Sequence, residues 1–175
     1  MKKYFIAMIL GSMLLSPMAM ATGTYGGLSI GQVRIDDIRT GNIGIVLGDI
    51  AESGFGYELF YNFTVDHDDD SVDGVDVEAE TDILSLFAVY QSPGDVYVKG
   101  KLGYAIVSLK FDIEDGGSES DTEKDFSAGI AAGVLIGDGA LELTYYRFPE
   151  FEKFDDVDVD DGEVDMIALT YLWTF

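Results

Sequence analysis

Four charged residues stand within segments that otherwise consist of apolar and small residues. Glu58, Lys99, Lys101 and Glu142 each lie a few residues from a short turn. If these segments are strands, a period of two places all four side chains on the face that carries the small residues. Charges in a narrow interior must be paired, because a lone buried charge is costly. We therefore predict crossing ion pairs that plug an interior, with pairs that rearrange to pass ions as the functional alternative.

His67 is the only histidine of the chain, and it lies between Asp66 and Asp68. A catalytic triad needs a base within hydrogen-bond reach of a nucleophile, and a third group that orients the base. His67, Asp68 and Ser71 are the residues that could supply these groups. The segment has no Gly-x-Ser-x-Gly or other recognisable catalytic setting. We therefore interpret His67 as a solvated loop residue and predict no catalytic site.

An acidic run near the end of the chain invites a calcium-binding interpretation. Residues 156–162 resemble the start of an EF-hand loop, but glycine falls at the seventh position instead of the sixth. The twelfth position is Ile167, where an EF-hand has glutamate. We predict no EF-hand, no specific metal site and no cofactor. Weak binding of divalent cations by clustered carboxylates remains open, against a purely solvated set of loops.

The elements that must position these residues are eight segments with alternating character. In each of them large apolar residues alternate with small or polar ones, which is the strand signal. The segments are 24–33, 41–49, 55–65, 83–91, 96–111, 126–136, 140–148 and 165–175. Short turns follow the second, fourth and sixth segments. Long acidic connections follow the third, fifth and seventh, at 66–82, 112–125 and 150–165, and hold 25 of the 33 acidic residues.

The two faces of these segments point to lipid on the outside. In 126–136 one face carries Ser127, Gly129, Ala131 and Gly133, while the other carries large apolar residues. Small residues suit a narrow interior, and large ones suit hydrocarbon. A soluble eight-stranded barrel places its large apolar residues inside instead.

The final segment has the same design. Ile167, Leu169, Tyr171, Trp173 and Phe175 share one face, with the aromatic residues at the end of the chain. An apolar band closed by aromatic residues is typical of a lipid-facing strand. An ordinary amphipathic core strand is the alternative for this segment taken alone.

The start of the chain reads as a targeting segment. Lys2 and Lys3 precede an apolar run, and small residues typical of a cleavage site follow it and end at Ala21. This is the pattern of a secretory signal peptide. We predict a cleaved signal peptide at 1–21 and one domain at 22–175. The chain has no cysteine, so no disulfide holds it together. A net charge of −23 argues against nucleic-acid binding.

Three pieces carry a resemblance to a known family: the terminal Tyr-Leu-Trp-Thr-Phe, the stretch 56–59 and the stretch 97–105. From residue 22 onward the chain resembles the OmpA/OmpX-type family of eight-stranded outer-membrane barrels. The resemblance implies an all-β, eight-stranded, antiparallel up-and-down transmembrane β-barrel, without the periplasmic domain that some relatives carry. It also implies that Tyr171, Trp173 and Phe175 are read by the barrel-assembly machinery, and that a lumen cluster of ion pairs is present.

The family spans several roles, and we predict a non-enzymatic one: membrane integrity or adhesion in the outer membrane of a Gram-negative bacterium. The expected partners are outer-membrane lipid and lipopolysaccharide, with divalent cations possible at the acidic loops. We expect a monomer with extracellular loops and periplasmic termini. The alternatives are a narrow, porin-like channel for ions or small solutes and a lipid-modifying enzyme.

Overall fold

The computed structural model describes residues 23–35, 38–67, 70–72, 75–113, 117–151 and 162–175. These residues form antiparallel strands, and they contain no helix that is long and apolar enough to cross a bilayer. The strands are β1 (Thr24–Ile35), β2 (Ile38–Ile50), β3 (Phe55–His67), β4 (Asp70–Val72), β5 (Val75–Gln91), β6 (Val96–Ile113), β7 (Gly117–Ile136), β8 (Gly139–Phe151) and β9 (Gly162–Thr174).

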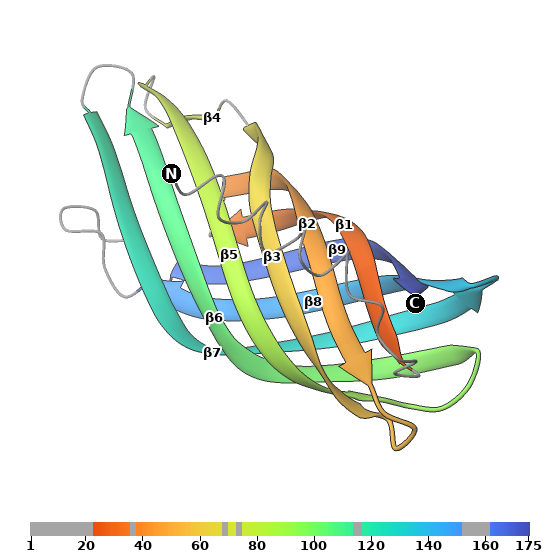
Figure 1. Ribbon diagram of the computed structural model, residues 1–175. Coiled ribbons are helices and arrows are strands. Elements are labelled where there is room, and N and C mark those ends of the chain that lie inside the picture. Colours follow the sequence, from red (N-terminus) through yellow and green to blue (C-terminus); the bar gives the residue numbers. More distant parts are fainter. Residues whose placement is uncertain (1–22, 36–37, 68–69, 73–74, 114–116, 152–161) are drawn as a thin grey trace.

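Eight of the strands close into a barrel. Neighbouring strands pair in the order β3, β2, β1, β9, β8, β7, β6, β5, and pairing between β3 and β5 completes the ring. The three-residue β4 pairs with β5 outside this ring. Figure 1 shows the strands winding around a common axis. The predicted all-β, eight-stranded antiparallel barrel is confirmed, and a closed ring leaves no strand edge for lipid to solvate.

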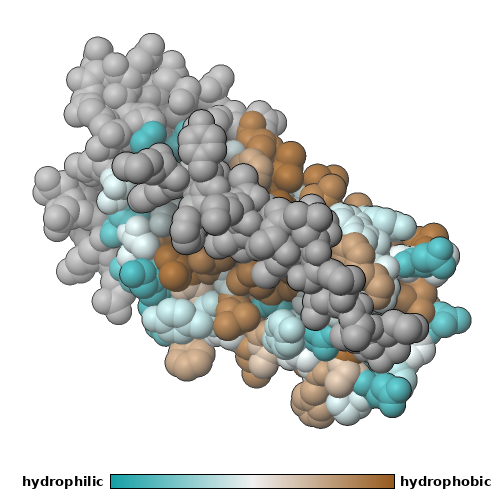
Figure 2. Space-filling model, viewed as in Figure 1, coloured by the Kyte–Doolittle hydropathy of each residue, from teal (hydrophilic) through white to brown (hydrophobic). Residues whose placement is uncertain are grey.

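Large apolar side chains cover the outer face of the barrel. Leu102 is 71 % exposed and Ile167 is 57 % exposed, whereas Ser29, one strand away from Ile167, is fully buried. Tyr61 and Trp173 share the parity of the exposed residues and are partly exposed. Figure 2 shows apolar residues over the middle of the outer wall, with hydrophilic residues toward both ends. The predicted outward orientation is confirmed for these residues, whereas Phe60, Phe87 and Met166 are buried inside the barrel.

The three short turns lie at one end of the barrel. Gly54, Gly94 and Gly137 have φ values of 85°, 117° and 61°, a region in which glycine has no Cβ penalty. The two ends of the ring meet there too, since the amide of Phe175 donates to the carbonyl of Thr24 at 3.1 Å. We call this end the turn end and the opposite end the loop end.

The acidic connections are shorter than the sequence predicted. Most of 112–125 is strand, because β6 and β7 stay in register from Val96 opposite Val134 to Ile113 opposite Gly117. Likewise β3 continues to His67 and β5 begins at Val75. The acidic residues of β7 alternate with Ser, Thr and Lys, so the ladder can continue beyond the apolar band.

Candidate functional site

Two lysines and two glutamates meet inside the barrel near the turn end. Lys101 Nζ lies 2.5 Å from Glu58 Oε1 and 2.9 Å from Glu142 Oε1. Lys99 Nζ lies 2.7 Å from Glu142 Oε2 and 3.5 Å from Glu58 Oε2. β3, β6 and β8 supply these four residues, which we call the lumen quartet. Their charges sum to zero, and all four side chains are buried.

Three tyrosines complete the hydrogen bonding of the quartet. Tyr25 Oη donates to Glu58 at 2.8 Å, and Tyr97 Oη donates to Glu142 at 3.2 Å. Lys101 Nζ donates to Tyr146 Oη at 2.9 Å. Hydrogen bonds that satisfy the remaining lone pairs are what make a buried ion pair tolerable. Sequence reasoning missed these tyrosines, although Tyr97 shares the inward parity of the two lysines.

Glycines on the adjacent strands make room for the rings. Gly48 is the partner of Tyr25 in the β1–β2 ladder, and a Cβ on Gly48 would lie 2.5 Å from Cζ of that tyrosine. Gly129 stands opposite Tyr146 in the same way, with 3.0 Å from a Cβ to Cδ1 of the ring. The inward-facing glycines therefore provide the space in which these aromatic rings pack against the inner wall.

Above the quartet, toward the loop end, aromatic rings fill the interior. The ring of Tyr146 lies 5.0 Å from Phe60, 5.6 Å from Phe148 and 5.7 Å from Phe87, measured between centroids. Glycines and paired charges were expected to fill the middle, and the structure adds these aromatic rings. Phe60 shares the inward parity of Glu58, and Phe87 shares that of Ser85.

The arrangement is suited to closing the lumen. The quartet is charge-compensated and buried, and the aromatic rings lie directly next to it. Among the residues that the structure describes, no group of three or more His, Cys, Asp or Glu side chains could hold a metal ion. The site can stabilise the barrel and block ion passage.

The other candidate residues lie elsewhere. His67 ends β3, and its backbone is paired with Thr40. The run 156–161 lies outside the described residues, as does the side chain of Ser71. Tyr171, Trp173 and Phe175 lie at the turn end, with centroid distances of 6.4 and 6.3 Å between successive rings.

A closed ring of eight strands, an apolar outer wall and a filled interior define a small transmembrane β-barrel. The chain belongs to the outer membrane protein beta-barrel domain family, whose profile matches residues 5–175. It is accordingly a protein of the bacterial outer membrane. No curated protein matches the sequence.

Several solved structures share the fold. Ail of Yersinia pestis, solved in complex with the heparin analogue sucrose octasulfate, is 18 % identical with a TM-score of 0.58, over 87 % of this chain and 97 % of that one. The N-terminal barrel of OprF from Pseudomonas aeruginosa is 10 % identical, with a TM-score of 0.57, over 85 % and 97 % of the two chains. Neisserial surface protein A is 12 % identical, with a TM-score of 0.55, over 87 % and 96 %. At these identities the likeness concerns the fold.

Proposed function

We propose that this chain is a non-enzymatic outer-membrane barrel that serves membrane integrity or surface attachment, and that it does not conduct ions. The lumen quartet carries this proposal. Four buried, mutually compensated charges and the adjoining aromatic rings occupy the interior of the barrel. An eight-stranded barrel is just wide enough for its side chains to fill it. The quartet thus acts as a static plug.

In this proposal residues 1–21 are a cleaved signal peptide, and the barrel at 22–175 works as a monomer. The turn end and both termini face the periplasm, while the loop end faces the exterior. Support comes from the sorting of the connections, since outer-membrane barrels have short periplasmic turns and longer extracellular loops. Tyr171, Trp173 and Phe175 present the final strand to the barrel-assembly machinery.

The negative charge of the loop end indicates which kinds of surface partner this protein would bind. The connections 66–82, 112–125 and 150–165 carry 25 of the 33 acidic residues, so the loop end is strongly negative. The Ail structure holds a polyanion, which such a surface would repel. Cationic surfaces suit these connections better, as do divalent cations that bridge to lipopolysaccharide phosphates.

Planar-bilayer conductance of the refolded protein tests the closed lumen. The wild-type protein is expected to be silent. The double variant Lys99→Ala/Glu142→Ala removes one charge of each sign and keeps the pair between Lys101 and Glu58, so conductance that appears only in this variant would show that the quartet contributes to closing the lumen. Regular conductance steps from wild-type protein would favour the channel alternative instead.

The surface role and the enzyme alternative have their own tests. Replacing 152–161 by a Gly-Ser linker should reduce attachment of cells to cationic surfaces while leaving heat-modifiability on gels unchanged. Unchanged attachment would count against the role proposed for this segment. His67→Ala should leave the lipid composition of the membrane unchanged, whereas an altered composition would support the enzyme alternative.

A further inference from the structure

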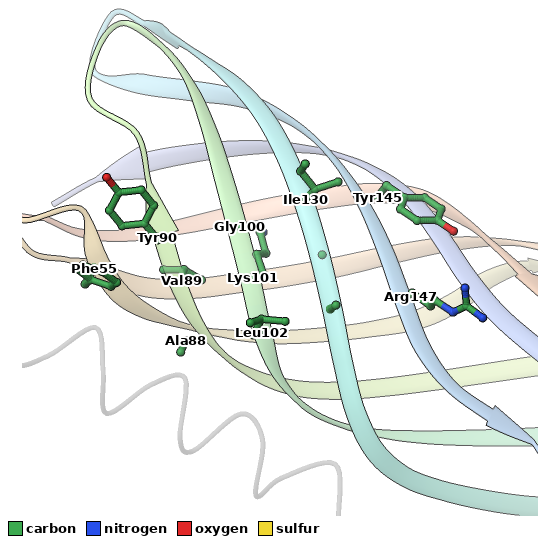
Figure 3. Close-up of a pocket in the computed structure, with 12 residues that line it drawn as sticks. Phe55, Ala88, Val89, Tyr90, Gly100, Lys101, Leu102, Ile130, Tyr145 and Arg147 are labelled. Atoms are coloured by element: carbon green, nitrogen blue, oxygen red, sulfur yellow. The ribbon is translucent and has the colours of Figure 1, made fainter.

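Three tyrosines on the outer face of the barrel share one geometry. In each case the hydroxyl reaches a residue two positions beyond the direct cross-strand partner of the tyrosine, on the side of the loop end. The pairs are Tyr61 with Asp82 at 3.4 Å, Tyr104 with the carbonyl of Lys124 at 3.1 Å, and Tyr145 with Asp165 at 2.8 Å. Figure 3 shows the hydroxyl of Tyr145 directed away from the turn end. Tyrosine takes this position at a membrane–water interface, with its ring in the apolar layer and its hydroxyl toward polar groups. We call this level the tyrosine border.

The outward side chains change from apolar to polar at the tyrosine border. On the turn-end side of the border, the outward residues of β5, β6 and β9 are large and apolar, and they include Leu84, Leu86, Leu102, Ile167 and Leu169. On the loop-end side, the outward residues of the same strands are polar, and they include Glu80, Asp82, Ser108, Lys110 and Glu163. Lipid covers only an apolar wall, so in the proposed orientation these strands leave the bilayer at the border and continue into water.

The inward side chains change in the opposite sense. The lumen quartet and its tyrosines lie toward the turn end, whereas toward the loop end the inward residues of five strands are apolar. Val107 and Leu109 of β6 are at most 1 % exposed, and both belong to one contiguous cluster of buried apolar residues. The members of this cluster at the loop end are Val33, Ile35, Ile83, Val107, Leu109, Phe148, Val164 and Met166. We call these eight residues the upper core. Direct cross-strand pairs such as Val107 with Ile83 join its strands.

Buried polar residues complete the wall where the upper core has no member. On β2 and β3 the side chain of Asn42 lies 3.0 Å from Thr40 Oγ1 and 3.2 Å from Thr64 Oγ1. The amide of Thr81 in β5 donates to Thr64 Oγ1 at 2.8 Å. Thr40, Asn42 and Thr81 are at most 3 % exposed. These residues bind one another and extend the closed inner surface around the barrel.

We propose that the barrel changes from a membrane design to a water-soluble design at the tyrosine border, and that the upper core closes the lumen a second time. A soluble barrel is apolar inside and polar outside, whereas a transmembrane barrel has the reverse arrangement. A dry constriction lined by aliphatic groups excludes ions, because it offers nothing that replaces their hydration. The upper core therefore acts in series with the lumen quartet and independently of charge. This inference rests on the proposed function, since it assigns further residues to the closed lumen, and it uses the orientation given there.

Single-cysteine labelling of the full chain in lipid nanodiscs tests the upper core, because the chain contains no cysteine of its own. Ser108→Cys, which faces outward beyond the border, should react quickly with a charged thiol reagent. Val107→Cys and Leu109→Cys face inward and should react at least about a hundredfold more slowly, because only local opening exposes them. Leu102→Cys is the matched control for the lipid-covered wall. It should react faster with a lipid-soluble reagent than Val107→Cys does, since lipid reaches the first position and not the second.

Heat-modifiability on gels checks that each variant is folded before its labelling rate is compared. Val107→Cys or Leu109→Cys reacting as fast as Ser108→Cys would show a water-filled outer lumen and would overturn the second closure. Ser108→Cys reacting as slowly as Leu102→Cys with the charged reagent would overturn the border. Labelling of intact cells separates this inference from the proposed function. If Ser108→Cys reacted only after the outer membrane was opened, the proposed orientation would fail, whereas slow labelling of Val107→Cys would still support the upper core.

Discussion

The ring of Tyr97 lies against the backbone of Gly133, its partner across β6 and β7, so that a Cβ on Gly133 would overlap the ring. The glycine lets the ring lie along the inner wall and lets its hydroxyl reach Glu142 at 3.2 Å. Tyr25 and Gly48 repeat the arrangement, with the hydroxyl on Glu58. Glycines in the wall and acids in the lumen thus belong to one structural unit.

Gly133→Ala should therefore lower the free energy of unfolding by about 1–3 kcal/mol, because an added methyl group in a filled interior forces neighbours to move. Urea unfolding of the protein in lipid vesicles measures the change. Gly100→Ala is the matched control, since nothing lies within 4 Å of the added Cβ. Equal effects of the two substitutions would contradict the role given to Gly133.

The lumen quartet should show strong coupling between its members. Lys101→Met leaves two buried carboxylates with Lys99 alone, and breaking a buried pair in this way costs about 3–5 kcal/mol. Lys101→Met/Glu58→Gln removes one charge of each sign and should recover much of that loss. The same unfolding assay, run as a double-mutant cycle, measures the coupling. Additive effects would show that the four charges act separately.

The aromatic rings above the quartet should matter more than those on the outer wall. Phe60→Ala should cost about 3–5 kcal/mol, because it leaves a cavity beside Tyr146. Phe126, which is 81 % exposed, provides the matched substitution. Phe126→Ala should cost less than half as much, since lipid fills the space. The comparison uses vesicle unfolding midpoints, and equal losses would count against a tightly filled interior.

The terminal aromatic residue should affect assembly in cells more than intrinsic folding. Phe175→Ala should lower the amount of heat-modifiable protein in the outer membrane, while refolding in detergent should stay close to wild type. Phe55→Ala, also an exposed aromatic at the turn end, should leave assembly unchanged. Equal assembly of the two variants would argue against recognition of the final strand.

The fold was predictable because the period of two is strong in this chain. Segments such as 55–65 alternate through most of their length, and a one-residue slip would turn every side chain to the wrong face. Turn residues such as Gly54 and Gly94 mark where the chain reverses. The same alternation placed Glu58, Lys99, Lys101 and Glu142 on one face.

The side-chain contacts and the strand lengths could not be predicted, because they depend on which residues are neighbours across the strands. The alternation puts Phe60 and Phe87 on the inward parity, but only the structure shows that they pack against Tyr146. The contact of Arg34 and Arg147 with opposite sides of Asp165 is known only once the register of β8, β9 and β1 is known. The length of β7 was missed because a run of acids resembles a loop, although the ladder with β6 continues through it.

The extension of β6 and β7 beyond the ring affects how two copies of the protein can meet. Described pairing between β7 and β8 begins at Ala128, so the preceding part of β7 has β6 on one side and no described strand on the other. Such an edge is a template for pairing with another chain. Asp121, Glu123 and Asp125 alternate along it. Two copies meeting side by side at this edge would bring like charges together, which opposes pairing between their strands.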